Sequence, residues 1–146
     1  MVEIKNATAL SDLFGHWPDF HDAELTALRL DATGHQGPSL EAHFEVAEWT
    51  SELDERGYFR ERQRVRVTLR FDDVRRLRLS GFLYQNVLFR LDAALAAPGD
   101  HDEVFGDDAQ GRRRFRVRWD SSIGCEADFL CDAIRVVAAE PVAQAT

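Results

Sequence analysis

Most of the chain alternates between apolar and polar residues, a pattern typical of strands with one packed face and one face in water. The alternating or largely apolar runs are residues 24–31, 40–46, 65–71, 77–79, 81–91, 115–119, 125–129 and 134–138. The first run needs a bulge, because Leu25 and Leu28 differ in parity. We therefore expect a mainly β protein (a β-rich α+β fold), whose antiparallel curled sheet or partly closed barrel has about 7–8 strands.

One short helix is expected near the N-terminus. Thr8 is a helix-capping residue type, apolar residues follow it at helical spacing, and Gly15 provides a stop. Pro18 prevents the helix from continuing and favours extended geometry at Trp17.

Two strand pairings follow from matching apolar faces. One hairpin would place Leu69 opposite Leu77. A second would place Trp119 opposite Cys125, and the same register sets Arg118 against Glu126 and Arg116 against Asp128. Arginines elsewhere alternate with apolar residues in the same way, which predicts an outer sheet face of ion pairs rather than a phosphate-binding surface.

Composition and charge narrow the function classes. A chain of 146 residues matches a single domain covering 1–146, and its formal net charge of −8 argues against nucleic-acid binding. No long apolar run and no basic, apolar leader is present, so we expect a cytoplasmic protein without a membrane interaction. Cys125 and Cys131 would lie roughly 20 Å apart in an extended segment, too far for a disulfide, which needs Cα atoms within about 7 Å.

Potential chemistry concentrates in residues 14–25. His21, Asp22 and Glu24 are metal-ligand and acid–base residue types, so a metal-dependent hydrolase is one alternative function. In an extended segment, however, Asp22 and Glu24 share a face that His21 does not, which makes a poor chelate. We therefore expect no metal, no cofactor and no catalysis. The structural alternative is that Asp22 caps backbone amides while Trp17 and Phe20 close one end of the core.

Gly15-His16-Trp17 also resembles the Gly-x-Trp start of lipocalin-like barrels. That resemblance implies a second alternative, a small-ligand-binding β-barrel with an enclosed apolar cavity. No nucleophile elbow and no glycine-rich phosphate loop is found in the sequence.

Three segments together resemble the immunity protein 50 family of bacterial polymorphic-toxin systems. They are residues 17–24 (WPDFHDAE), 79–88 (LSGFLYQNVL) and 124–134 (GCEADFLCDAI). The resemblance implies a cytosolic antitoxin that binds a cognate toxin domain and blocks its active site without chemistry of its own. The family-motif residues whose role is open are Trp17, Phe20, His21, Asp22, Glu24, Gln85 and Asn86.

Two polar, acidic segments, 48–60 and 99–111, are expected to be surface loops that contact this partner. Their acidity suggests a basic toxin, and Trp49 and Tyr58 are residue types enriched at interface hot spots. The expected toxin-binding residues are Glu48, Trp49, Glu52, Asp54, Glu55, Tyr58, Asp100, Asp102, Glu103, Asp107 and Asp108. A homodimer is the other assembly that we consider.

Overall fold

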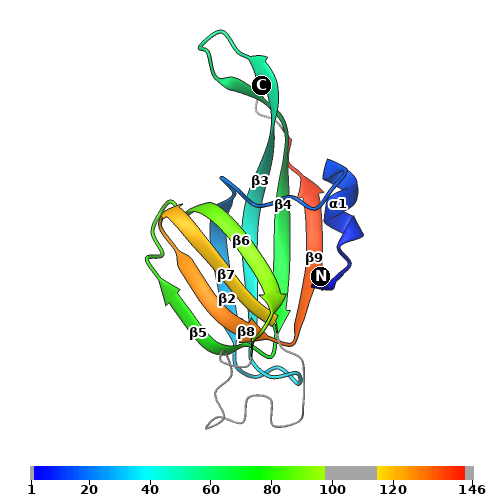
Figure 1. The fold of residues 1–146 in the computed structure, drawn as a ribbon, viewed down its shortest axis with the longest axis vertical. Coiled ribbons are helices and arrows are strands. Elements are labelled where there is room, and N and C mark those ends of the chain that lie inside the picture. The colour runs from blue at the N-terminus through cyan, green and yellow to red at the C-terminus, as the bar shows by residue number, and fades with distance from the viewer. Residues whose placement is uncertain (1, 98–114, 144–146) are drawn as a thin grey trace.

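The computed structural model describes residues 2–97 and 115–143 (Figure 1). In these ranges the elements are β1 (Ile4–Lys5), α1 (Thr8–Phe14), β2 (Glu24–Asp31), β3 (Ser39–Leu53), β4 (Phe59–Asp72), β5 (Arg75–Ser80), β6 (Val87–Leu95), β7 (Phe115–Ile123), β8 (Glu126–Cys131) and β9 (Ala133–Pro141). The described part of the chain contains no helix of the length and apolarity needed to span a membrane.

The strands of the described residues form one sheet in the order β1-β9-β4-β3-β2-β6-β7-β8-β5. All paired strands are antiparallel except β1 and β9, which run parallel. The sheet is curled but not closed, since β1 and β5 remain edges. The predicted mainly β fold with a short N-terminal helix is therefore confirmed, with β1 as a short strand that the sequence pattern did not predict.

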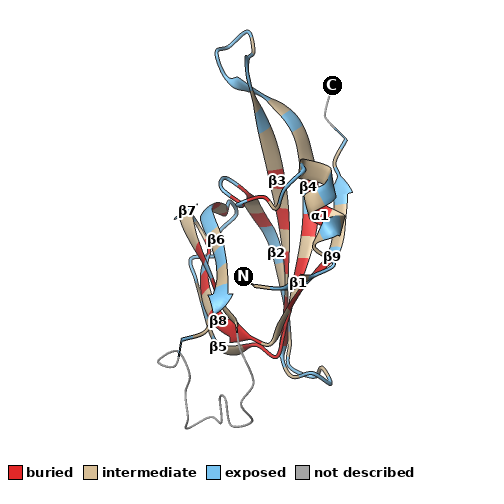
Figure 2. Cartoon of the chain, turned by 45° about the vertical axis from the view of Figure 1, so that its right-hand side comes forward, coloured by how far each residue is buried: buried red, intermediate tan, exposed pale blue. Residues whose placement is uncertain are grey.

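The core lies between two halves of this sheet, β2-β3-β4-β9 and β6-β7-β8-β5. The Trp119 ring of β7 lies 5.7 Å from the Phe44 ring of β3 and 6.4 Å from the Phe71 ring of β4, measured between centroids. Buried residues accordingly line the facing sides of the two halves (Figure 2). Within the described residues, the register of β2 with β6 contains a single pair, Glu24 opposite Val87.

Helix α1 ends as the sequence predicts but begins differently. Gly15 has a φ of 79°, and its N–H donates to the Ser11 carbonyl at 2.8 Å. The positive φ explains why glycine suits this stop. Thr8 is the first helical residue rather than the cap, so that prediction is wrong; Ala7 holds the cap position without a side-chain hydrogen bond.

The predicted hairpin of 65–71 with 77–79 is wrong. β4 instead lies between β3 and β9, with Leu69 opposite Val136, while β5 pairs with β8 at the far edge of the sheet. The chain leaves β4 through Asp73, whose φ is 52°, and the Val74 N–H donates to the Pro38 carbonyl. Both β9 and β5 have apolar residues at every second position, Ile134 and Val136 on β9 and Leu77 and Leu79 on β5. The alternation therefore predicts which face of a strand is buried but not which strand lies beside it.

The β7–β8 hairpin forms, but the predicted register is wrong by two residues. Trp119 lies opposite Ala127, not Cys125. A shift of two keeps every side chain on its face, so apolar matching alone does not exclude it. Arg118 is then opposite Asp128, and the expected Arg116–Asp128 ion pair survives as a diagonal contact of 2.9 Å.

Ion pairs cover the outer face of the sheet, as the sequence indicates. Glu45 on β3 contacts Arg64 and Arg66 on β4 at 3.4 and 3.3 Å. On the other half, the hydrogen bond from Arg116 lowers the pKa of Asp128 below its ordinary range. These arginines are engaged by neighbouring carboxylates, which supports the structural interpretation of the arginine rows.

Three smaller expectations have clear outcomes. β2 contains the expected irregularity, between Leu25 and Ala27. In the run 81–91 only the part from Val87 is strand. Cys125 and Cys131 are buried and form no disulfide, and burial raises the pKa of the Cys125 thiol.

Candidate functional site

An arm projects from the body of the sheet. β3 and β4 continue beyond it as a two-stranded ribbon, residues 47–64, which we call the arm (Figure 1). The expectation that 48–60 is a loop is thus wrong for most of the segment, because β3 extends to Leu53 and β4 begins at Phe59. Cross-strand pairing holds the ribbon together although its side chains do not alternate cleanly.

Asp54 shapes the tip of the arm. Its Oδ1 accepts hydrogen bonds from the Arg56 and Tyr58 backbone N–H groups, both at 2.9 Å. The Gly57 N–H donates to the Asp54 carbonyl at 3.1 Å, and Gly57 has a φ of 84°. One of the predicted toxin-binding carboxylates therefore has a local task, which is to hold the turn.

Large apolar side chains are exposed along the arm. Trp49 is 52% exposed, Leu53 57%, Tyr58 69% and Phe59 58%. Leu53 and Phe59 lie directly opposite each other at the tip. Glu52 and Glu55 are also exposed there. Several exposed apolar side chains on one projecting element, with carboxylates beside them, are typical of a protein-binding surface.

A groove of about 390 Å³ lies at the base of the arm. One wall is the link between α1 and β2, and the other is the strand β3. The lining residues are Phe14, His16, Trp17, Pro18, Asp19, His21, Asp22, Val46, Ala47, Glu48 and Trp49. The structure thus brings together much of the 14–25 stretch and the first two residues of the predicted toxin-binding set.

Glu48 is held inside this groove. Its Oε1 is buried without a hydrogen bond in the described residues, and the Arg62 Nε lies 3.3 Å away as an ion-pair partner. The carboxylate is four-fifths covered, whereas the Arg62 side chain is largely exposed. Glu48 therefore contributes negative charge to the wall of the groove rather than to the open surface.

The family-motif segment is fixed by its backbone. Phe20 and Asp22 have φ values of 64° and 63°. The Asp22 N–H donates to the Leu88 carbonyl and the Leu88 N–H donates to the Ala23 carbonyl, which ties the segment to β6. These bonds hold two non-glycine residues in a costly left-handed conformation.

Phe20 packs into the core end as expected, with its ring 5.4 Å from that of Phe44 and 5.8 Å from that of Trp17. The expected capping role of Asp22 is wrong: Asp19 Oδ1 accepts the His21 N–H at 2.8 Å, and Asp22 Oδ2 contacts His21 Nδ1 at 3.3 Å. Asp19 therefore caps the backbone of His21, and Asp22 contacts its imidazole.

His21, Asp22 and Glu24 do not form one cluster. His21 and Asp22 are exposed, and the His21 ring lies 5.6 Å from Phe89 on β6. Glu24 begins β2, opposite Glu45 and Val87. Among residues 2–97 and 115–143, no three His, Cys, Asp or Glu side chains gather closely enough to hold a metal ion. The hydrolase alternative stays a prediction without a gathered site.

Asn86 links three parts of the fold. Its Oδ1 accepts the Leu83 and Cys125 backbone N–H groups, both at 2.9 Å. Its Nδ2 donates to the Leu83 and Leu25 carbonyls at 2.8 and 3.4 Å. Asn86 is 2% exposed, whereas its neighbour Gln85 is exposed. These contacts indicate a structural role for Asn86, which connects the three segments.

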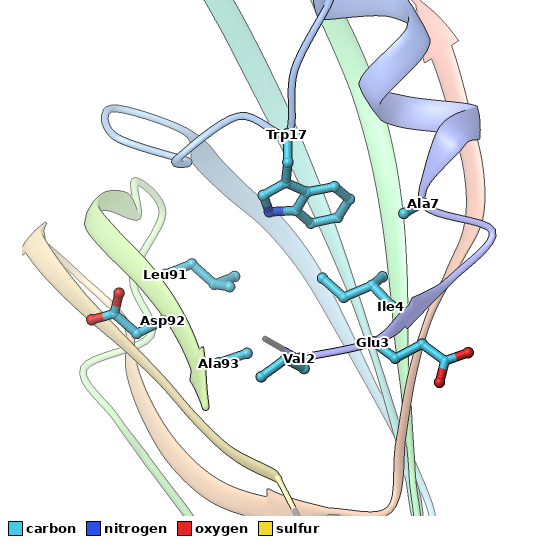
Figure 3. Close-up of a pocket in the computed structure, with 8 residues that line it drawn as sticks. All are labelled: Val2, Glu3, Ile4, Ala7, Trp17, Leu91, Asp92 and Ala93. Carbon is cyan, nitrogen blue, oxygen red and sulfur yellow. The ribbon is translucent and has the colours of Figure 1, made fainter. Parts of the chain in front are cut away.

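A second hollow, of about 650 Å³, lies between the N-terminal segment and β6 (Figure 3). Its lining residues are Val2, Glu3, Ile4, Ala7, Trp17, Leu91, Asp92 and Ala93. The trough is mostly apolar but open on one side, whereas the ligand-barrel alternative predicts an enclosed cavity in a closed barrel. The sheet is open, so it does not match the closed barrel that the ligand-binding alternative predicts. Uptake of a small ligand stays a prediction.

The remaining predicted toxin-binding residues lie outside the described residues. They are Asp100, Asp102, Glu103, Asp107 and Asp108. Leu53 and Phe59 on the arm, and His16 and Asp19 in the groove, were not among the predicted site residues. The signal for Leu53 and Phe59 was their apolar character within an otherwise polar segment.

Comparison with known proteins adds the family. No curated protein and no solved structure matches the chain significantly. The family model described as Immunity protein 50 matches residues 6–142, which is nearly the whole chain. Its span includes the arm, the groove and the motif segments. The chain therefore belongs to the immunity protein 50 family.

Proposed function

We propose that this protein is a cytoplasmic antitoxin, a single domain that binds a cognate toxin domain and neutralises it by covering its active site. The observation that carries the proposal is the arm, with its exposed Trp49, Leu53, Tyr58 and Phe59. Membership of an immunity protein family supports a protein partner, and the function requires no catalysis by this chain.

The surface chemistry favours a basic partner. The arm carries Glu52 and Glu55 beside its aromatic residues, and the whole chain has a net charge of −8. Desolvated aromatic anchors supply affinity, and complementary charge raises the association rate and selects the partner. A basic toxin domain is therefore the class of protein that this arm would bind best.

Binding to the toxin domain encoded beside the gene of this protein tests the proposal. We expect the Trp49→Ser and Tyr58→Ser double variant to bind that toxin at least 100-fold more weakly than the wild type, measured by titration calorimetry, and to protect cells poorly on co-expression.

The matched control is Leu30→Ser. Leu30 is similarly exposed but lies near the end of β2 that is remote from the arm, opposite Leu40. We expect this variant to bind as the wild type does. Wild-type affinity in the arm double variant would show that the arm is not the binding element.

A further inference from the structure

We propose that the open edge of β3 at the base of the arm, residues 47–49, accepts an extended basic segment of the toxin as an added β-strand. The inference rests on the proposed function and specifies how the partner is recognised. It starts from the direction of one backbone amide, that of Ala47, which two independent hydrogen bonds determine.

The first bond fixes the direction from the β2 side. The Leu25 N–H donates to the Asn86 carbonyl, away from β3. Phe44, opposite Leu25, therefore directs its own N–H and C=O toward β4. Because these groups alternate along a strand, those of Glu45 and Ala47 point toward the β2 side.

The second bond gives the same answer from the β4 side. Ala47 lies opposite Arg64, and the Arg64 carbonyl accepts the Val142 N–H at 2.8 Å. Arg64 thus directs its backbone groups away from β3. In an antiparallel ladder the residue opposite does the same, so the Ala47 N–H and C=O point out of the ribbon.

No strand occupies that side of Ala47 among the described residues. β2 begins at Glu24, opposite Glu45, and so ends two residues short. Two amides of the link that faces this edge are engaged elsewhere: the Asp22 N–H bonds Leu88 and the His21 N–H bonds Asp19. Within the described residues the N–H and C=O of Ala47 are therefore open beside the groove, the arrangement to which peptides add as strands.

The chemistry of the groove selects the added strand. Asp19, Asp22 and Glu48 line it, together with Trp17 and Trp49. A lysine or arginine side chain on the added strand would meet negative charge and aromatic faces, which attract cations. An extended segment with basic side chains is hence the occupant that this edge favours.

The test removes the one amide. Ala47→Pro deletes the N–H, and proline is tolerated where a strand N–H points away from the sheet. Ala47→Ser keeps the N–H and serves as the matched control. We expect Ala47→Pro to bind the toxin domain encoded beside the gene at least tenfold more weakly than Ala47→Ser, with both variants folded by circular dichroism. Equal affinities would overturn the proposal.

Hydrogen exchange of the wild type keeps the test decisive even if the proline variant fails to fold. Exchange of the Ala47 amide should slow at least tenfold when the toxin domain is bound. Unchanged exchange in a complex that does form would overturn the added strand while the proposed function stands. Absence of any complex would overturn both. Protection that appears without toxin and rises with protein concentration would assign the edge to a homodimer instead.

Discussion

Asn86 connects several segments of the fold, although the pattern of apolar and polar residues does not mark it. It satisfies two backbone donors and two backbone carbonyls in β2, the 81–86 loop and the start of β8. A buried amide that is fully used in this way joins segments that share no strand pairing.

The change Asn86→Ala tests this role. It leaves the Leu83 and Cys125 N–H groups without their acceptor, and we expect the free energy of unfolding to fall by about 2–4 kcal/mol. Urea denaturation measures the loss. Gln85→Ala is the control: Gln85 is exposed, so its change should stay within about 0.5 kcal/mol. Equal effects of the two substitutions would contradict the structural role.

Asp128 gives the protein a pH-dependent contribution to stability. The hydrogen bond from Arg116 lowers the pKa of its carboxyl group, with burial acting in the opposite direction. A carboxylate with a lowered pKa stabilises the fold above its unfolded pKa, and the contribution disappears as pH falls through the folded pKa.

We therefore expect Asp128→Asn to be less stable than the wild type at pH 7, by about 1 kcal/mol or less because the pair is one-third exposed. The difference should vanish in acid, below the lowered pKa of Asp128. Thermal unfolding of both proteins from about pH 2 to about pH 7, a range that includes the ordinary carboxyl pKa, measures this difference in stability. A constant difference over the range would contradict the assignment.

At the residue scale, the sequence drew attention to residues 14–25 but did not predict how their side chains are arranged. Rings and carboxylates marked residues 14–25, and several of them do line one groove. The division of labour between Asp19 and Asp22 depends on the left-handed conformation of Phe20 and Asp22. Neither residue type requires that conformation, so only the hydrogen bonds to β6 reveal it.

At the scale of elements, the arm is structurally separate from the body of the sheet. Its strands pair with each other, whereas β9 pairs with β4 only as far as Val65, and the Val142 N–H bonds the Arg64 carbonyl just beyond. A two-stranded ribbon contributes little stability by itself, because most of its surface stays in water.

Shortening the arm tests this separation. Replacing residues 50–60 by Asn-Gly leaves Trp49 and Glu61 joined by a two-residue hairpin turn. We expect the free energy of unfolding to change by less than about 1 kcal/mol while toxin binding is lost. Denaturation and titration on the same preparation measure both. A large loss of stability would show that the arm belongs to the folding core.

Strand existence was predictable where strand partnership was not. The alternation of 40–46, 65–71, 115–119 and 125–129 locates β3, β4, β7 and β8 and their inner faces. It does not specify that β4 pairs with β9 rather than β5, because any strand with one apolar face satisfies it. The arm was missed for the opposite reason: both of its faces are exposed, so no alternation marks it.

At the scale of the whole molecule, the motif residues lie where the two halves of the open sheet meet. The two halves meet over Trp119, Phe44 and Phe71, and in the described residues the strand register between β2 and β6 is limited to the pair Glu24–Val87. The bonds of Asp22, Ala23 and Asn86 lie at this junction. The motif segments therefore connect the two halves of the sheet, below the groove and the arm.

The net charge of −8 should attract a basic toxin at long range and raise the association rate constant. We expect the association rate constant to fall about tenfold or more between low salt and 0.5 M salt, since screening removes long-range attraction. The double variant Glu52→Lys and Glu55→Lys should associate more slowly and depend less on salt. Adding Asp102→Lys and Asp107→Lys to it tests the second acidic segment.

The control is the double variant Glu3→Lys and Glu126→Lys, which changes the net charge by the same amount at positions away from the arm. If both double variants associate alike in stopped-flow measurements, net charge rather than the arm steers the encounter, and the carboxylates assigned to toxin binding are wrong.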